Sequence, residues 1–197
     1  RFLSLDIDQG PPVVIRCCYS CSRVAASVDM EIRLPSNVYS LLVETNNGNI
    51  ILESPGCPVK AQTCNGFIRA SGSSGAFSLS TRNGAVDSSA TGPLSSISTL
   101  NGNIRARVSA LSSEGASITS TLGSIELQLP DTLAAELDAT AGRGALGLEG
   151  LRLDSPAAGY GFLRGRLGAG GPRLLARTRL GSLTVSRLQP DGGATPA

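Results

Sequence analysis

The sequence predicts an all-β fold: a single-domain parallel β-helix or β-solenoid with coils of about 18–21 residues. One observation behind this prediction is an Asn-Gly pair that recurs every 18 residues, at 47–48, 65–66, 83–84 and 101–102. Another is that each pair has Thr two residues before the Asn and an aliphatic residue two after the Gly. A repeat this short cannot bury an apolar face alone, so successive repeats must stack on one another.

Within each repeat the apolar positions are two residues apart, which is the period of a strand with one buried face. The predicted inward positions of the first strand are Leu41, Val59, Phe77, Ser95, Ala116, Leu137 and Leu174, with Val43, Ala61, Leu79, Ile97, Ile118, Ala139 and Ala176 two residues later. A second strand is predicted to start at Ile50, Ile68, Val86, Ile104, Ile125, Leu146 and Leu183. The corner between the strands is expected to use Asn-Gly because these residues tolerate positive φ.

The polar positions of the repeat predict hydrogen bonds between neighbouring coils. Inward-facing Thr hydroxyls and the corner Asn amides are expected to form hydrogen bonds from coil to coil, about 4.8 Å apart. The Thr positions are Thr45, Thr63, Thr81, Thr99 and Thr178.

The chain is predicted to contain five segments. Residues 1–40 keep the strand alternation without the repeat and are expected to cap the solenoid, where open strand edges would otherwise be exposed. Residues 41–148 are the regular coils, and the Gly-rich residues 149–173 are expected to form a hairpin or loop excursion. Residues 174–188 return as the last coil, and residues 189–197 are expected to be a disordered tail. Because the chain begins at Arg1 without Met, we expect it to be part of a longer protein.

Composition agrees with a narrow coil interior. Hydrophobic residues make up 41% of the chain but aromatic residues only 4%, and Trp is absent. The net charge of +2 favours no particular partner, but the charge is uneven. Residues 1–149 carry 10 basic and 13 acidic groups, whereas residues 150–197 carry 7 Arg and 2 Asp.

A strand that ends in Leu-Pro and is followed by Thr-x-x-Gly-x-Ile occurs in this chain, and a related pattern occurs further along. These motifs are Met30–Pro35 with Val43–Ile50, and Ile125–Pro130 with Leu137–Thr140 and Gly144–Leu146. The pattern resembles the DUF4097 family, an adhesin-type family with a toastrack β-solenoid domain, over residues 28–188. The cysteine cluster at 17–21 and the Arg-rich C-terminal part depart from that family's pattern.

The resemblance implies a noncatalytic scaffold or adhesion and interaction module, placed at an extracytoplasmic or membrane-associated site. Any membrane tether is expected outside these residues. The alternatives are a structural subunit of a large, organelle-associated assembly and a polysaccharide-acting β-helix enzyme.

The residue types argue against catalysis. The chain has no His, which removes the usual general base and the Ser-His-Asp and Cys-His arrangements. The outward positions three residues after the repeat Gly alternate in sign, as a cross-strand ion ladder would; they are Arg69, Asp87, Arg105 and Glu126. We therefore expect no catalytic residues and no cofactor.

The five cysteines leave three interpretations open: a metal site, disulfides and plain burial. Cys17, Cys18 and Cys21 with Cys57 and Cys64 supply enough thiolates for zinc, but the spacing of the second pair is poor and no His completes the set. Disulfides suit an oxidising compartment, although five cysteines leave one unpaired. Plain burial is favoured for Cys64, and no metal site is expected.

Small hydroxyl residues occupy the outward positions of the first strand in three consecutive repeats. They are Ser78, Ser80, Ser96, Ser98, Ser117 and Thr119. Such a flat array is either a solvated sheet face or a contact face for a glycan, a protein or ice, and it contains no aromatic platform.

The C-terminal Arg residues predict an electrostatic contact with an acidic protein partner or another anionic surface. The residues expected to make it are Arg164, Arg166, Arg173, Arg177 and Arg179. Nucleic acid is not expected, because no aromatic residues are interleaved with these arginines and the rest of the chain is acidic.

Overall fold

The computed structural model describes residues 3–8, 14–19, 33, 38–89 and 91–188. The described part of the chain is all-β, with parallel strands in two of its three sheets and no helix. The chain divides into two compact units, residues 1–33 and residues 34–197.

The first unit contains an antiparallel pair of strands, β1 (Leu3–Asp8) and β2 (Val14–Tyr19), in which Leu3 lies opposite Tyr19. The strand expected at Met30–Pro35, apart from Arg33, and the tail at 189–197 lie outside the described residues. The capping role expected of residues 1–40 stays a prediction.

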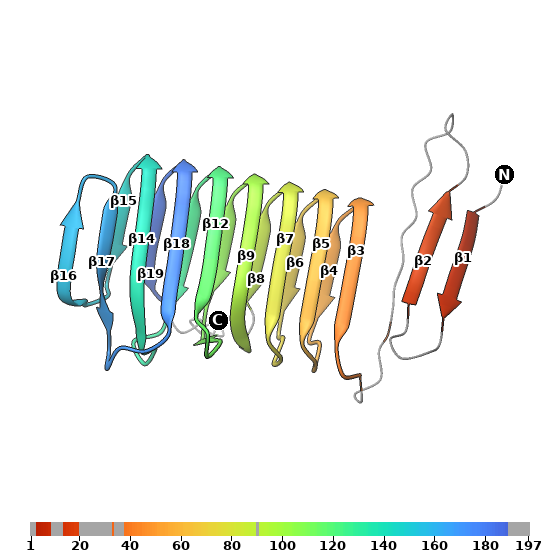
Figure 1. Ribbon diagram of the computed structural model, residues 1–197, viewed down its shortest axis with the longest axis horizontal. Helices are drawn as coiled ribbons and strands as arrows, with labels where there is room; N and C mark the ends of the chain where they lie inside the picture. The colour runs from red at the N-terminus through yellow and green to blue at the C-terminus, as the bar shows by residue number, and fades with distance from the viewer. Residues whose placement is uncertain (1–2, 9–13, 20–32, 34–37, 90, 189–197) are drawn as a thin grey trace, which may run out of the picture. The chain divides into compact units, whose positions relative to one another are not determined.

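The second unit consists of two sheets that face each other, and the chain alternates between them (Figure 1). Successive members of the ten-stranded sheet lie in the order β16 (Asp154–Gly159), β17 (Phe162–Leu167), β14 (Ala135–Arg143), β18 (Arg173–Leu180), β12 (Ala116–Leu122), β9 (Pro93–Asn101), β7 (Phe77–Asn83), β5 (Val59–Asn65) and β3 (Leu41–Asn47), with β11 (Ala110–Leu111) paired to β9. Those of the seven-stranded sheet lie in the order β15 (Leu146–Glu149), β19 (Leu183–Arg187), β13 (Ile125–Leu129), β10 (Ile104–Arg107), β8 (Val86–Ser89), β6 (Ile68–Ser71) and β4 (Ile50–Glu53).

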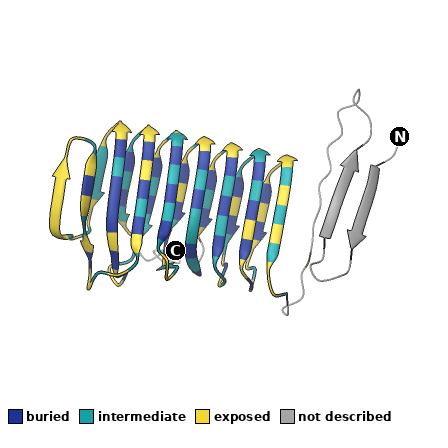
Figure 2. Cartoon of the chain, viewed as in Figure 1, coloured by how far each residue is buried: buried dark blue, intermediate teal, exposed yellow. Residues whose placement is uncertain are grey.

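The core lies between the two sheets. More and less buried positions alternate along most strands of this unit, as the banding in Figure 2 shows, whereas β16 at the sheet edge is exposed throughout. Leu79, Ile97 and Ile118 line the core from the larger sheet, and Ile68 and Ile104 line it from the smaller one. The predicted inward columns are confirmed at these positions.

One predicted inward residue is wrong. Leu94, rather than Ser95, lies opposite Phe77 and is fully buried, whereas Ser95 is only half-buried. The register of β7 with β9 shifts between Phe77 and Ser78, so a bulge places the larger apolar side chain in the core.

The order of the coils differs from the order of the chain. Residues 174–188 are not at the end of the stack as predicted: β18 lies between β12 and β14, and β19 lies between β13 and β15 (Figure 1). The coil of β14 and β15 thus leaves one strand position open beside β12 and β13. The C-terminal coil, β18 and β19, fills this position.

Residues 149–173 extend the larger sheet beyond β14. Strands β16 and β17 form an antiparallel hairpin, and β17 pairs with β14. Leu163 and Leu167 of β17 are buried in the core, with Leu151 and Leu153 packed against it. This segment therefore contains the hairpin that was one of its two predicted forms, and the hairpin packs against the core.

The corners of the repeat carry two hydrogen-bond ladders, as predicted. The Thr63, Thr81 and Thr99 hydroxyls donate to the carbonyl oxygens of Gly48, Gly66 and Gly84 in the neighbouring coil, at 3.0, 2.9 and 3.0 Å. The Asn65, Asn83 and Asn101 amides each donate to the Asn of the preceding coil, at 2.7, 2.8 and 2.7 Å.

Candidate interaction surface

The outer face of the ten-stranded sheet presents the predicted hydroxyl array. Its six residues lie on β7, β9 and β12 and are paired in register across the three strands. Ser78 Oγ lies 2.6 Å from Ser96 Oγ, and Ser98 Oγ donates to Ser80 Oγ at 3.0 Å. All six side chains are half-buried, and the four serines of β7 and β9 use part of their hydrogen-bonding capacity within the array.

The predicted Arg residues lie on the same face, on β17 and β18. Arg177 of β18 is in register with Thr119 of β12 on one side and Thr140 of β14 on the other. One row of the sheet therefore runs from Ser80 through Ser98 and Thr119 to Arg177. The insertion of β18 beside β12 brings together two groups that appeared separate in the sequence.

Asp138 on β14 lies under two of these arginines and was missed by the sequence reasoning. Its side chain accepts a hydrogen bond from Arg164 Nε at 3.2 Å and another from Arg173 Nη2, while Asp138 itself is only 4% exposed. Burial alone would raise the pKa of Asp138, but the hydrogen bonds and charges of Arg173 and Arg164 outweigh it and lower that pKa below the usual 3.8. Arg164 and Arg173 thus hold the sheet together, and their charge is partly neutralised.

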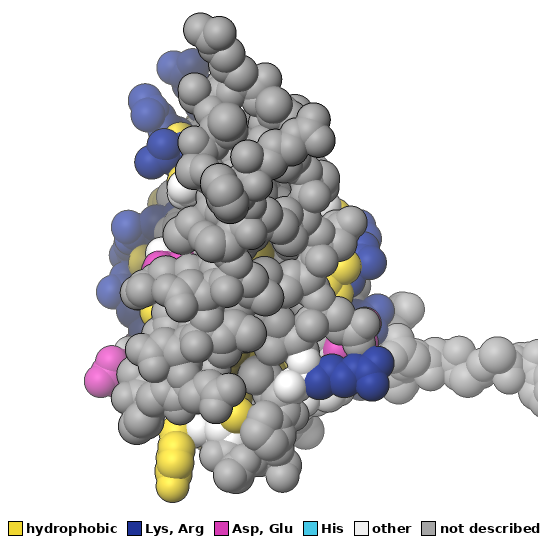
Figure 3. Space-filling view, turned by 90° about the vertical axis from the view of Figure 1, so that its right-hand side faces the viewer, with side chains coloured by type: hydrophobic (Ala, Val, Ile, Leu, Met, Phe, Trp, Pro, Cys, Tyr) yellow, Lys and Arg dark blue, Asp and Glu magenta, His cyan; other side chains and the backbone are white. Residues whose placement is uncertain are grey.

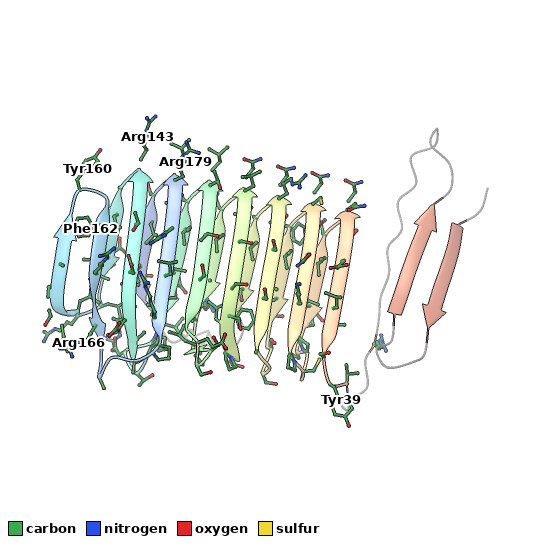
Figure 4. All side chains as sticks on the ribbon, viewed as in Figure 1. Tyr39, Arg143, Tyr160, Phe162, Arg166 and Arg179 are labelled. Carbon is green, nitrogen blue, oxygen red and sulfur yellow. The ribbon has the colours of Figure 1, made fainter. Side chains whose placement is uncertain are left out.

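The remaining arginines of this face are exposed and form no ion pair with another described residue: Arg166, Arg177, Arg179 and Arg143. Arg143, at the end of β14, lies beside Leu180 of β18. Figure 4 shows Arg143 and Arg179 at the same edge as the turn between β16 and β17. In the end-on view of Figure 3, Lys and Arg side chains project along both flanks.

Two aromatic residues lie toward the same edge as Arg143, Arg177 and Arg179, although the sequence reasoning expected none on this face. Tyr160 in the β16–β17 turn is 99% exposed, and Phe162 at the start of β17 is 37% exposed. Phe162 is in register with Thr140, which places it in the same row as Arg177. The Tyr-Gly-Phe run at 160–162, inside a predicted hairpin, is the signal that would have identified this pair.

We use the term Arg surface for Arg143, Arg177, Arg179, Tyr160 and Phe162. Arg166 lies at the other end of β17, in register with Glu136, and is not part of it (Figure 4). An open depression lies at the start of β12 and β18, lined by Glu114, Ser117, Arg173 and Leu175 among others, and none of its lining residues belongs to the Arg surface. Exposed Arg and aromatic side chains are the residue types enriched at protein interfaces.

The opposite face, formed by the seven-stranded sheet, carries the predicted ion ladder. Arg69 Nε lies 3.7 Å from Asp87 Oδ2, and Arg105 Nε lies 3.0 Å from Glu126 Oε2. Each carboxylate is held beside a guanidinium across a strand pair, which confirms the alternating column.

The cysteines that the structure describes in full are both free thiols. Cys57 is buried, whereas Cys64 is half-exposed and its Sγ lies 3.9 Å from Asn46 Oδ1, so the predicted burial of Cys64 is wrong. The side chains of the other three cysteines lie outside the description. Over the described residues, no cluster of three or more His, Cys, Asp or Glu side chains could hold a metal ion.

No helix able to cross a membrane occurs in the described part of the chain. Comparison with protein-family models, with curated proteins and with solved structures found no match to this chain.

Proposed function

We propose that this chain is a noncatalytic β-solenoid interaction module of the DUF4097 type, which binds an acidic protein through the Arg surface. The alternation of the chain between two stacked sheets at 18-residue steps supports the solenoid, because each step adds one strand to both sheets. The place that this family implies, extracytoplasmic or membrane-associated, is part of the proposal.

One observation carries the binding role: exposed arginines without an ion-pair partner among the described residues stand next to exposed aromatic rings. A guanidinium can form two parallel hydrogen bonds to one carboxylate, so acidic side chains are its best protein partners. Tyr160 and Phe162 supply apolar contact area at the same place. The hydroxyl array continues from Arg177 as an uncharged contact face.

Binding of a labelled poly-glutamate peptide tests this role. The Arg177→Glu/Arg179→Glu variant should bind at least about tenfold more weakly than the wild type, which corresponds to about 1.4 kcal/mol. Binding by the wild type should weaken as salt is raised, because salt screens exposed charges. Arg164 is left unchanged because it pairs with Asp138, and its reversal would disturb the fold.

The matched control is Lys60→Glu/Arg82→Glu, which makes the same charge change at two exposed positions of β5 and β7 on the same sheet face. Equal loss in both variants would show a general charge effect and contradict a specific Arg surface. Binding to anionic lipid vesicles but not to poly-glutamate would show that the partner of the Arg surface is a membrane and not an acidic protein.

The absence of catalysis is part of the same proposal and is tested separately. We expect no turnover on a panel of polysaccharides, because each carboxylate of the ion ladder is held beside an Arg of a neighbouring strand. Hydrolysis that disappears in Asp87→Asn or Glu126→Gln would establish the enzyme alternative instead.

A further inference from the structure

The C-terminal coil occupies a slot that the rest of the chain leaves open. Strands β12 and β13 form one wall of the slot, and β14 and β15 form the other. The connection at 130–134 leads from β13 to β14 past the empty position. Only after the β16–β17 hairpin does the chain return to fill it with β18 and β19.

The inserted coil bonds to both walls. Its Leu180 carbonyl oxygen accepts from Gly123 N at 2.8 Å, and its Gly181 N donates to the Arg143 carbonyl oxygen at 3.2 Å. On the other sheet, Ile125 N donates to the Ser182 carbonyl oxygen and Leu183 N donates to that of Ala145, both at 2.9 Å. Side chains bond across the slot as well: the Thr178 hydroxyl donates to the Gly123 carbonyl oxygen at 2.8 Å, and the Ser186 hydroxyl donates to that of Leu127 at 3.3 Å.

The apolar face of the inserted coil belongs to the core of the walls. Leu174, Ala176, Leu183 and Val185 are each 0% exposed. If this coil were absent, the facing edges of β12 and β14 would stand two strand spacings apart, about 9.6 Å. The slot therefore has the shape and hydrogen-bonding groups of a site for one strand–corner–strand segment in parallel orientation.

The segment is tied to the rest of its own chain by one short, tight connection. Residues 168–172 cross the start of β14, and a Cβ on Gly171 would lie only 2.7 Å from the Ala134 carbonyl oxygen. Gly168 and Gly170 have positive φ values of 56° and 80°. Glycine adopts these φ values without strain, so the connection limits the segment by its length: five residues must cross β14, and a short hinge of this kind favours exchange of the segment between copies.

We propose that the slot is a binding site for residues 172–188 of a second copy of this chain, so that two copies exchange their C-terminal coils. All contacts that hold the coil in the slot are noncovalent and are identical whichever copy supplies it. Only the path of residues 168–172 differs between the closed and the exchanged forms. The proposal is independent of the Arg surface and its acidic partner.

Shortening the connection of the full chain tests the proposal. Deleting residues 168–171 leaves one residue, Pro172, between β17 and β18. Its two Cα–Cα steps reach at most about 7.6 Å, less than the distance of about 9.6 Å across β14, so the coil cannot reach its own slot and should enter that of another copy. The variant should elute as a dimer with wild-type β-sheet content, whereas a control with three Gly inserted after Gly170 should be monomeric at the same concentration. A folded monomer of the shortened chain would overturn the proposal.

A second measurement keeps the connection intact until the protein has folded. A protease site is inserted between Ala169 and Gly170, the folded chain is cut, and it is then denatured and refolded with an excess of labelled peptide 172–188. The label should be taken up at one peptide per chain. Refolding without the label, or no refolding, would overturn the proposal.

Two peptide variants show whether uptake uses the slot. Ala176 points into the core and Arg177 points outward from the same strand. The Ala176→Asp peptide should enter at least about tenfold less well because a charge would be buried, whereas the Arg177→Ser peptide should enter as well as the unmodified one. Equal uptake of both variants would show binding elsewhere and would also overturn the proposal.

Discussion

At the corners of the repeat, glycine is required by the neighbouring coil. Gly84 does not adopt a φ between +20° and +160°. The prediction that the corner uses Gly because it tolerates positive φ is therefore wrong at this position. A Cβ on Gly84 would instead overlap the carbonyl oxygen of Gly66, and one on Gly102 would overlap that of Gly84. The corners stack backbone on backbone, and this leaves no room for a side chain.

We predict that Gly84→Ala destabilises the protein by about 1–3 kcal/mol, because the added methyl group forces the stacked backbones apart. Denaturant unfolding measures the loss. The control is Gly56→Ala, since a Cβ on Gly56 meets no atom within 4 Å and the residue has no positive φ. Equal stability of the two variants would contradict the stacked-corner explanation.

Asp138 is the residue whose charge matters most to the fold. Its lowered pKa means that the folded state holds the carboxylate in the charged form more strongly than the unfolded chain does. Its contribution is therefore fully present above the unfolded pKa and is lost as the pH falls through the folded pKa, a window that begins near 3.8.

We predict that Asp138→Asn costs about 1.5–3 kcal/mol at neutral pH, the range of hydrogen bonds to charged groups. The stability difference from the wild type should be constant from about pH 8 to 5 and should shrink below about pH 4. Asp87→Asn is the comparison: both partners of its ion pair are about half exposed, so its loss should be below about 1 kcal/mol. Thermal unfolding over this pH range decides the matter, and a pH-independent cost for Asp138→Asn would refute the linkage.

At the scale of the elements, the five strand pairs of the larger sheet from β3–β5 to β12–β18 are each held by an inward hydroxyl as well as by the backbone. Thr81 is 4% exposed on the inward side of β7, where an aliphatic residue would ordinarily stand. Its hydroxyl reaches the Gly66 carbonyl oxygen next to the corner, where the strand ladder ends. The hydroxyl therefore carries the cross-coil bonding into the corner.

We predict that Thr81→Val lowers the free energy of unfolding by about 1 kcal/mol, because the side-chain shape is kept while the hydrogen bond is lost. Thr45→Val at the equivalent place of β3 should cost less, since Thr45 is half-exposed and its hydroxyl donates to Asn47 O only at 3.4 Å. Chemical denaturation of both variants checks the order. A larger loss for Thr45→Val would show that the ladder does not act through burial.

At the scale of the whole second unit, stability does not follow chain position. The C-terminal coil lies between two others and is paired on both sides, whereas β16, earlier in the chain, is exposed along its whole length at the sheet edge. Opening an edge strand disrupts few contacts, but opening β18 separates two walls of the core.

We predict that the amides of Ala176, Thr178 and Val185 exchange with solvent as slowly as those of β9, although they lie close to the C-terminus. Amides of β16 should exchange fastest among the strands of this unit. Hydrogen exchange followed residue by residue measures both. Fast exchange over residues 174–185 together with slow exchange in β9 would show that the inserted coil opens on its own.

The candidate site could be predicted only in part. The hydroxyl array follows from strand parity, and the Arg residues follow from the uneven charge, so both were visible in the sequence. Their meeting at Thr119 and Arg177 was not visible, because residues 58 positions apart become neighbours only through the insertion of β18. The burial of Asp138 escaped prediction for the same reason: its Arg partners come from β17 and β18.

The sequence alone determined the all-β class, the corners and most inward positions. The period of two residues along a strand and of 18 residues along the chain can be recognised from the residue types of short segments. Only the tertiary structure decided the order of the coils. All coils present nearly the same columns of aliphatic residues, so the pattern of one coil fits against several others. The choice depends on which arrangement pairs the most strand edges and buries the most apolar surface, and that is a property of the folded unit. The last coil lies between two others and is paired on both sides. The residue types of 174–188 resemble those of the other coils, so this position could not be predicted from them.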